Sequence, residues 1–290
     1  MKHYCFTSEG GIMSSIKIIT DSCADINDNL KKEFDTEEMI PFYMHIAGET
    51  FVDDHSLSIP VLLQKMKDCT EKMASSCSDP ETWKSAFEKA KKAFAVTLSQ
   101  KLSGSYASAC AGLDMAKEDS GCEGYVFDSQ SAVSGETLLT IKLREYINEG
   151  FSMTEIIEKA EAFISKMRTF FVLDDVSNLV KNGRMSNMKG AIVQILGIKL
   201  ILGEKDGAIE LFDKVRGYKH IADKMVSMIA KSGRIIDGDD FVISHCNNLS
   251  LATEIMEKAK AQFNFGKIRI VEMKGLSSFY ACDRGLCMSF

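Results

Sequence analysis

The sequence predicts an α/β protein with two α/β domains: an N-terminal domain whose parallel sheet is flanked by helices, and a C-terminal domain of mixed α/β structure. Three observations support this fold class. The chain has 290 residues, which is above the usual size of a domain with one hydrophobic core. Short β-branched runs alternate with longer helical patterns in the first half, as is typical of a parallel sheet with helices on both faces. A hairpin pattern interrupts this alternation in the second half.

The first half holds three short apolar runs that we interpret as strands. The run 16–20 is rich in β-branched side chains and is followed by Asp21-Ser22. Helical patterns follow the strands, and one of them begins with Ser78-Asp79-Pro80, a helix cap with proline in the first turn. We expect the other strands at 94–98 and 125–127, and helices at 59–68, 80–92, 106–117, 132–148 and 153–167.

The second half begins with a predicted strand at 170–173 and a short helix that ends at Asn182-Gly183, a C-cap signal. Apolar runs at 198–203 and 208–212 flank Glu204-Lys205-Asp206-Gly207, which predicts a β-hairpin on an Asp-Gly turn. We expect the remaining elements to be helices at 218–231 and 250–262, and strands at 241–244, 268–271 and 286–290.

We place the domain boundary near residues 166–170, with the N-terminal domain over 14–167 and the C-terminal domain over 168–290. Residues 1–13 are expected to form a disordered leader. The apolar pattern starts only after Met13, which is itself a candidate initiator. The leader lacks the run of ~7–15 apolar residues that a secretory signal peptide needs.

Composition and charge exclude several classes of protein. The net charge of −6 argues against a broad nucleic-acid interface, which would favour a basic domain. No stretch approaches ~18 consecutive apolar residues, so we expect no membrane-spanning helix and no stable membrane insertion. The nine cysteines form no CxxC pair and match no zinc or disulfide spacing, which indicates a reduced, cytoplasmic protein.

Hydroxyl-rich segments follow the three strands of the first half: Thr20-Asp21-Ser22, the stretch 99–105 and Asp128-Ser129. Ligands of open parallel sheets bind outside the carboxyl ends of the strands. Gly104 permits close approach of the backbone, and a helix that starts after it would offer free N–H groups to a carboxylate or a phosphate. The other interpretation, that these serines only cap helices, stays open at this point.

Two arginines that follow element ends are candidates for anion binding. Arg184 comes just after the helix end at Asn182-Gly183, and Arg216 lies in Lys214-Val215-Arg216-Gly217. A guanidinium group matches a carboxylate with two parallel hydrogen bonds. Arginines in such places are more commonly solvated surface charges, so both interpretations stay open.

The known catalytic motifs are absent, because no GxxxxGK[ST], HExxH, GxSxG or GxGxxG pattern occurs. Asp21 and Asp25 lack a third metal ligand, and an aspartate after a first strand commonly caps the next helix. Cys23 has no partner histidine that the sequence indicates. His245 ends a predicted strand, where a structural role is more common. We therefore expect no cofactor, no metal and no catalytic residue.

Seven segments follow one another in a recognisable order, and they cover almost everything after Met13. They are 18–25, 98–106, 126–129, 171–174, 182–186, 197–202 and 214–217. Any one of them is a weak signal, whereas seven in order and at the right spacing are specific. Together they resemble the DegV family of bacterial fatty-acid-binding proteins.

The resemblance implies a long-chain fatty acid held in a tunnel between the two domains, its carboxylate bound by hydroxyls and an arginine. Some members of the family present the bound acid to a separate fatty acid kinase, which makes an acyl phosphate for phospholipid synthesis. Carried over to this sequence, the expected ligand-binding residues are Ser75, Ser103, Gly104, Ser105, Arg184 and Tyr280, and Arg216 is the expected contact with the partner or a phosphate.

Two positions depart from the family pattern. Ala74 stands where the family has a threonine, so one hydroxyl is lost, and Tyr280 stands in the place of a histidine. Tyr280 can still donate a hydrogen bond, but it carries no positive charge near pH 7. Binding of a carboxylate is compatible with both changes.

A carrier without turnover of its own is the first interpretation. The alternative is an enzyme, a phosphotransferase or hydrolase that acts on a small acyl or phosphorylated substrate in the same pocket, with Asp21 or Cys23 taking part. A regulator that senses lipids through a partner protein is a third interpretation.

Overall fold

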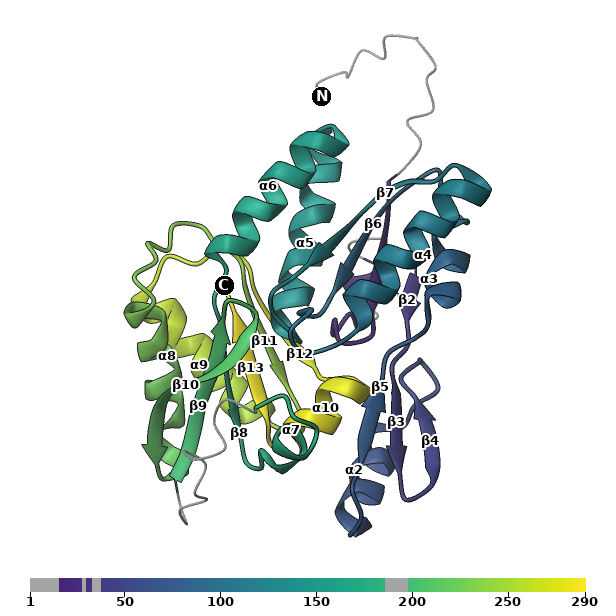
Figure 1. The fold of residues 1–290 in the computed structure, drawn as a ribbon. Coiled ribbons are helices and arrows are strands. Elements are labelled where there is room, and N and C mark those ends of the chain that lie inside the picture. The colour runs from purple at the N-terminus through teal and green to yellow at the C-terminus, as the bar shows by residue number, and fades with distance from the viewer. Residues whose placement is uncertain (1–15, 28–29, 33–37, 186–197) are drawn as a thin grey trace.

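The computed structural model describes residues 16–27, 30–32, 38–185 and 198–290 (Figure 1). Within these residues the chain forms a parallel four-stranded sheet, a mixed six-stranded sheet and a small antiparallel sheet. This confirms the predicted α/β class. The predicted leader lies outside the described residues.

The parallel sheet is built from the first half of the chain and is covered by helices on both faces. Neighbouring residues of its strands face opposite sides, so that Ile19 packs with Trp83 and Leu113 on one face and Ile18 packs with Leu139 on the other. The strand order is β2 (Glu38–Ile40), β1 (Lys17–Asp21), β6 (Lys92–Thr97) and β7 (Glu123–Asp128); α3 (Pro80–Phe87) and α4 (Ser105–Ser120) cover the first face, and α5 (Ser134–Asn148) and α6 (Met153–Lys166) cover the second.

The six-stranded sheet is built from the second half, and its strands are antiparallel neighbours except for one parallel pair. Two helices cover one of its faces through a core that includes Phe241, Met225 and Ile255. The strand order is β10 (Ala208–Arg216), β9 (Ile198–Lys205), β8 (Thr169–Leu173), β13 (Leu286–Ser289), β11 (Phe241–His245) and β12 (Ile268–Glu272), with helices α8 (Ile221–Lys231) and α9 (Leu249–Gln262).

Helix α5 lies between the two large sheets and packs on both (Figure 1). Leu139 and Leu143 join the core of the parallel sheet. Leu138 and Ile141 pack instead with Val242 and Val271 of the six-stranded sheet. Helix α5 therefore carries apolar side chains on two faces, one for each sheet.

The hairpin predicted from the Asp-Gly turn is present as β9 and β10, which pair over their full length apart from one irregularity between Leu211 and Asp213. Asp206 and Gly207 have φ values of 51° and 80°, so both turn residues adopt the left-handed backbone that such a two-residue turn requires. The predicted strand 286–290 is also confirmed, with β13 ending at Ser289.

One predicted helix is shorter than expected. The pattern predicted 80–92, whereas α3 ends at Phe87 and β6 already begins at Lys92. The last turn is tightened by bonds from Lys89 N–H to Ala86 O and from Ala90 N–H to Phe87 O, which leaves the following residues free to enter the strand.

The antiparallel three-stranded sheet and the short helix over residues 275–281 were not predicted from the sequence. The sheet and the helices α2 and α10 enclose a core with Met44, Leu62 and Phe279. The strand order is β4 (Glu49–Val52), β3 (Tyr43–Ile46) and β5 (Ala74–Ser76), with helices α2 (Ile59–Asp68) and α10 (Gly275–Ala281). The helix α7 (Ser177–Lys181) ends at the predicted place, just before Asn182 and Gly183.

Candidate functional site

A cavity of about 310 Å³ lies where the carboxyl ends of the parallel strands meet the six-stranded sheet and α10. This volume is at the lower end of the ~300–1,000 Å³ range of small-molecule sites. Strand β8 contributes alternate residues, because side chains of one face recur every second position. The apolar wall includes Phe42, Leu98, Leu102, Val133, Phe171, Leu173, Leu179, Ile209 and Leu276.

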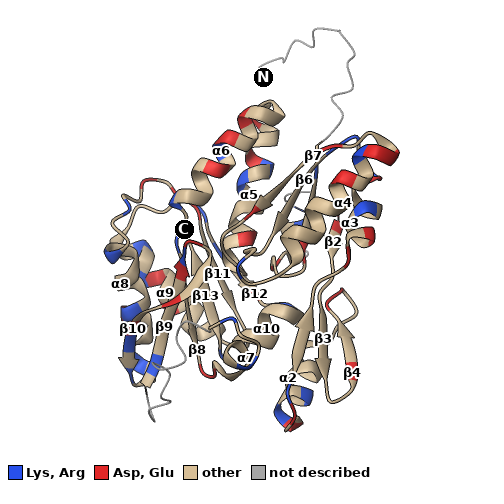
Figure 2. Cartoon of the chain, in the orientation of Figure 1, with Lys and Arg blue, Asp and Glu red and all other residues tan. Residues whose placement is uncertain are grey.

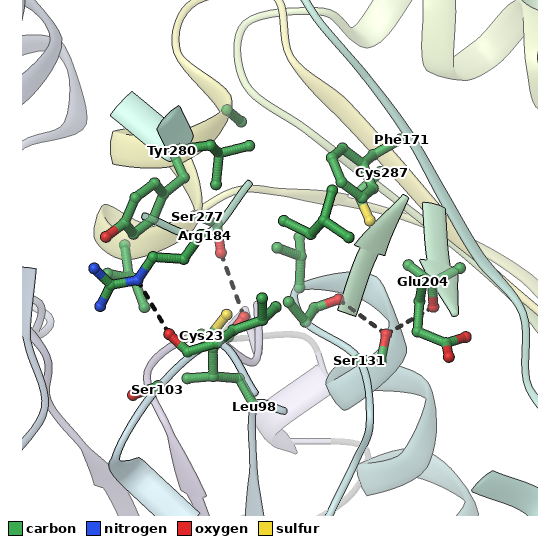
Figure 3. A pocket seen from close by; sticks show the side chains of 18 of the residues that line it. Cys23, Leu98, Ser103, Ser131, Phe171, Arg184, Glu204, Ser277, Tyr280 and Cys287 are labelled. Carbon is green, nitrogen blue, oxygen red and sulfur yellow. Dashed lines mark hydrogen bonds between the residues drawn. The ribbon is translucent and has the colours of Figure 1, made fainter. Parts of the chain in front are cut away.

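The two charged side chains among the described lining residues are Arg184 and Glu204. Figure 3 places Arg184 beside Tyr280 at one end of the cavity and Glu204 beside Ser131 at the other. The cavity therefore has two polar ends and an apolar middle.

The first polar end combines residues from four distant parts of the chain. Ser75 Oγ and Tyr280 Oη form a 2.7 Å hydrogen bond, and Ser103 and Arg184 line the same end (Figure 3). Burial raises the pKa of the Tyr280 hydroxyl above its ordinary value, against the opposing effects of the Ser75 bond and the Arg184 charge. Tyr280 therefore stays a neutral hydrogen-bonding group at physiological pH.

Backbone carbonyl groups fix the guanidinium group of Arg184. Its Nε donates to Leu102 O at 3.1 Å and its Nη1 donates to Asn182 O at 2.6 Å. These bonds join the end of α7 to the Leu102-Ser103-Gly104 loop and hold the charge at the cavity without neutralising it. A fixed, half-buried guanidinium group is well suited to a carboxylate.

The loop before α4 brings backbone donors to the same end. Ser103 Oγ accepts the N–H of Ser105 at 3.1 Å, and Gly104 precedes the first helical residue. A Cβ on Gly104 would lie 3.6 Å from Sγ of Cys77, the residue after β5, which is an ordinary van der Waals contact. The N-terminus of this 16-residue helix adds a partial positive charge beside Arg184.

Two buried aspartates hold α10, and thereby Tyr280, against the first half of the chain. Asp53 accepts the N–H groups of Gly275 and Leu276, each at 2.8 Å, and Asp25 Oδ1 accepts the N–H of Lys274 at 2.9 Å. Burial raises the pKa of Asp25 to about 7, although the Lys274 N–H opposes this shift. Asp25, considered above as a metal ligand, thus has an anchoring role.

Asp21 accepts three hydrogen bonds that shape the loops beneath the cavity. They come from Cys23 N–H at 3.1 Å, Leu98 N–H at 3.0 Å and Ser105 Oγ at 2.7 Å. Glu136 of α5 lies against this carboxyl group, and burial raises the pKa of both carboxyl groups. Asp21 thus ties the ends of β1 and β6 to the start of α4.

Cys23 lines the cavity but is poorly suited to act as a nucleophile. Burial raises the pKa of its thiol well above the ordinary value, and the neighbouring Glu136 and Asp21 raise it further. A thiol in this environment is a poor source of thiolate. His245 is buried, accepts the Asn248 N–H at 3.3 Å, and is not among the described lining residues.

The structure brings together five of the six expected ligand-binding residues: Ser75, Ser103, Gly104, Arg184 and Tyr280 all line the cavity. Ser105 does not line it, because its hydroxyl donates to Asp21 inside the protein. Sequence reasoning missed Ser131, Thr169 and Glu204 at the other end. Their only signal was the hydroxyl-rich segment around Ser129 and the polar turn of the predicted hairpin.

Arg216 lies away from the cavity, on an exposed surface at the end of β10. It borders a shallow hollow together with Lys214, His220 and Lys224. Figure 2 shows Lys and Arg residues gathered along α8 and β10. Arg216 is therefore exposed on the surface and does not contact the contents of the cavity.

Two kinds of feature are absent from the part of the chain that the structure describes. None of the helices between residues 16 and 290 that the structure describes is both long enough and apolar enough to cross a membrane. Over the same residues, His, Cys, Asp and Glu side chains form no group of three or more that could hold a metal ion.

Comparison with known proteins gives a consistent result over nearly the whole chain. The model of the DegV family, described as uncharacterised proteins, matches residues 15–287. A DegV domain-containing protein of Streptococcus gordonii is 34% identical over 278 residues, which cover 94% of this chain and 98% of the relative.

Two solved structures share the fold and about a third of the sequence. A DegV family protein of Ruminococcus gnavus, refined with vaccenic acid, has a TM-score of 0.90 and 33% identity over 96% of this chain and 100% of its own. The Fatty Acid Kinase (Fak) B3 protein of Streptococcus pneumoniae, loaded with linoleic acid, has a TM-score of 0.87 and 34% identity over 95% of this chain and 99% of its own. With a family match over most of its length, the chain belongs to the DegV family.

Proposed function

We propose that the cavity is a tunnel between the two halves of the protein and that it binds a long-chain fatty acid. The protein would present the carboxylate of this acid to a separate fatty acid kinase. The observation that carries the proposal is the arrangement of Arg184, Ser75, Ser103 and Tyr280 at one end of an otherwise largely apolar cavity. The protein acts in this account as a cytoplasmic carrier without turnover of its own.

The tail would supply most of the binding free energy. A sixteen-carbon acid buries roughly fourteen methylene groups at about 0.8 kcal/mol each, or about 11 kcal/mol of gross transfer free energy. The loss of translational freedom and the ordering of the chain consume a part of this. The lining of Phe, Leu and Ile side chains provides the apolar surface that the tail needs.

The head group would set the orientation. Arg184 already uses Nε and Nη1 for backbone carbonyl groups, which fixes the plane in which the guanidinium group can meet a carboxylate. Ser103 and one hydroxyl of the Ser75–Tyr280 pair would donate the further hydrogen bonds, because the other hydroxyl of that pair donates to its partner. Because Tyr280 is neutral, Arg184 would be the main source of positive charge for the head group.

Handover to a kinase would use the surface around Arg216. One protein with the same fold is named as a fatty acid kinase B3 protein, and the exposed arginine here lies among other basic side chains. The kinase would supply the nucleotide and the catalytic groups, because the Asp21 carboxyl group already accepts three structural hydrogen bonds and burial raises the pKa of the Cys23 thiol.

Titration calorimetry on delipidated protein tests the head-group assignment. Hexadecanoic acid should bind at least tenfold more tightly than 1-hexadecanol, which has the same tail without the carboxylate. Arg184→Ala should remove most of this difference by weakening acid binding, and Ser103→Ala should reduce it partly. Arg216→Ala is the matched control and should leave both affinities unchanged. Equal affinity for acid and alcohol in the unmodified protein would contradict the proposal.

A further inference from the structure

The end of the cavity opposite Arg184 is polar, and a plain hydrocarbon tail would leave its polar groups without a ligand partner. Ser131, Thr169 and Glu204 line this end. Figure 3 places Ser131 and Glu204 on the side away from Arg184 and Tyr280. An apolar chain terminus is a poor match for a carboxyl group and two hydroxyls.

Strand pairing explains how these side chains meet. Phe170 of β8 is opposite Gly203 of β9, so Thr169 and Glu204 are the next opposing positions. Opposing residues of an antiparallel pair project from the same face of the sheet. Thr169, Phe171 and Leu173 all line the cavity, and β8 spans roughly 13 Å from the first to the last at ~3.3 Å per residue.

Hydrogen bonds among the hydroxyl groups here form a chain with a direction. Ser134 Oγ donates to Cys287 Sγ at 3.1 Å, and further links join Ser134 to Ser289 at 2.7 Å, Ser289 to Thr169 at 2.8 Å and Thr169 to Ser131 at 2.7 Å. Each hydroxyl has one proton to donate. Because Ser134 uses its proton for Cys287, Ser289 must donate to Ser134 and Thr169 must donate to Ser289. Ser131 must then donate to Thr169.

Ser131 therefore begins this chain and keeps acceptor capacity at the cavity. Its proton points to Thr169 Oγ1 at 2.7 Å, with Ala132 O as a more distant acceptor at 3.5 Å, so the oxygen offers lone pairs and no proton to a ligand. A Cβ at Gly135 would lie 2.0 Å from Ser131 Oγ and 3.0 Å from Thr169 Oγ1, so a glycine is required where the two hydroxyls meet.

Glu204 is the second acceptor. Its Oε1 accepts the N–H of Gly207 at 3.2 Å, which positions the carboxyl group at the hairpin turn. The turn is itself held to the first half of the chain, because Ser99 Oγ donates to Gly207 O at 2.6 Å. Two acceptors on separate elements are thus held in fixed positions at one end of an otherwise apolar space.

We propose that the Ser131–Glu204 end of the cavity is a subsite for a hydroxyl group on the far part of the chain, so that the protein accepts long-chain hydroxy fatty acids. The ligand hydroxyl donates its proton to Glu204 or to Ser131. This inference rests on the proposed function, since it requires the carboxylate to lie at Arg184.

Competition calorimetry with four ligands tests the subsite: hexadecanoic acid and its 2-, 12- and 16-hydroxy derivatives. A buried hydroxyl without a partner weakens binding, so a purely apolar far end would disfavour the 12- and 16-hydroxy acids by tenfold or more. The subsite predicts that at least one of these two binds as tightly as hexadecanoic acid, or more tightly. The 2-hydroxy acid, with its hydroxyl next to the carboxylate, gains nothing there.

Variants assign the effect to the proposed groups. Ser131→Ala and Glu204→Leu should each lower the affinity for the favoured hydroxy acid at least tenfold while changing that for hexadecanoic acid less than threefold. Ser120→Ala is the matched control, because it removes a serine hydroxyl that donates to Ala116 O within α4 and does not line the cavity.

The outcomes distinguish failure of the proposed fatty acid binding from failure of the proposed hydroxyl subsite. If hexadecanoic acid itself fails to bind, the proposed function is wrong. If it binds, and both far-hydroxylated acids bind tenfold or more weakly, the subsite alone is overturned. Equal losses for hydroxylated and plain acids in Ser131→Ala and Glu204→Leu would also overturn it, since that pattern indicates a structural role only.

Discussion

The hydroxyl groups of Ser75 and Tyr280 are joined by a 2.7 Å hydrogen bond across 205 positions of sequence. Ser75 belongs to β5, in the small antiparallel sheet, and Tyr280 belongs to α10, near the C-terminus. The bond closes one end of the cavity and connects an early segment of the chain with a late one. It presents two hydroxyls to a ligand beside Arg184.

Tyr280→Phe should weaken fatty acid binding about three- to tenfold. The change removes one hydroxyl and leaves Ser75 without its partner, while the ring that packs with Phe279 is retained. Titration calorimetry with hexadecanoic acid measures the effect. Tyr125→Phe is the matched control, because Tyr125 donates to Glu161 and does not line the cavity. Equal affinities for Tyr280→Phe and the unmodified protein would place the head group elsewhere.

Tyr280→His should make the affinity depend on pH. Burial raises the pKa of Tyr280, so in the unmodified protein this residue stays neutral and adds no pH dependence of its own to binding between pH 6 and pH 8. A histidine gains its charge as pH falls through about 6.5, and a positive charge strengthens carboxylate binding. We expect tighter binding by the variant at pH 6 than at pH 8. A flat profile in the variant would count against a carboxylate at this position.

Asp25→Asn should reduce the loss of stability at rising pH. Between about pH 4 and pH 7 the folded protein keeps a proton on Asp25 that the unfolded chain has released, so the free energy of unfolding falls as pH rises. The full shift corresponds to at most roughly 4 kcal/mol. Asparagine cannot ionise and keeps an oxygen for the Lys274 N–H.

Urea denaturation at pH 5 and pH 8 checks this prediction. The variant should lose clearly less stability between the two pH values than the unmodified protein, although Asp53 and Glu136 still contribute in the same direction. Asp54→Asn is the control, because Asp54 is only partly buried and its pKa is lowered by hydrogen bonds from Ser56. An unchanged slope in Asp25→Asn would mean that Asp25 is already ionised when folded.

Val133 should tolerate glycine better than alanine. It has φ 59° and ψ −116° at the start of α5, in the position of a tight turn that favours glycine, and its side chain lines the cavity. Such backbone strain in a β-branched residue is of order 1–3 kcal/mol. Both substitutions lose side-chain packing, but only glycine relieves the strain.

We therefore expect Val133→Gly to be more stable than Val133→Ala by about 1 kcal/mol in urea denaturation. The matched pair is Val126→Gly and Val126→Ala in β7, where the backbone is ordinary and alanine should be the more stable choice. If alanine were the more stable substitution at both positions, the backbone of Val133 would not be strained.

Arg216→Ala should separate lipid binding from handover. Arg216 is exposed and does not line the cavity, so the affinity for hexadecanoic acid should not change. In an assay with a fatty acid kinase and ATP, acyl-phosphate formation should fall at least tenfold. Lys231→Ala, which removes a basic side chain of α8 outside this hollow, is the control. A parallel loss of lipid binding in Arg216→Ala would contradict its assignment to a partner surface.

The sequence predicts the large sheets because their strands carry strong local signals. β1 and β6 are buried β-branched and apolar runs, and the hairpin is marked by Asp206-Gly207. The strand β5 could not be recognised in this way, since Ala74-Ser75-Ser76 has neither length nor apolar alternation. Its pairing with β3 is a long-range contact that depends on the rest of the fold.

In the candidate site, too, some residues have local sequence signals and others depend on long-range contacts. Ser103 and Gly104 follow a predicted strand, so the sequence predicts a ligand site near them at this edge of the sheet, whereas the assignment of Arg184 to the same site rests on the family resemblance. Ser105 has the same local pattern, yet its hydroxyl turns inward to Asp21. The groups Ser131 and Glu204 meet only through the pairing of β8 with β9 and the placement of the hairpin turn, which no local pattern encodes.

Mass spectrometry of an organic extract from protein purified without added lipid decides whether the cavity is a fatty-acid site. We expect a long-chain fatty acid at close to one molecule per chain, and clearly less in Arg184→Ala purified in parallel. A folded protein whose extract holds no fatty acid, or holds a different small molecule at this stoichiometry, would contradict the claim that the cavity is a fatty-acid site.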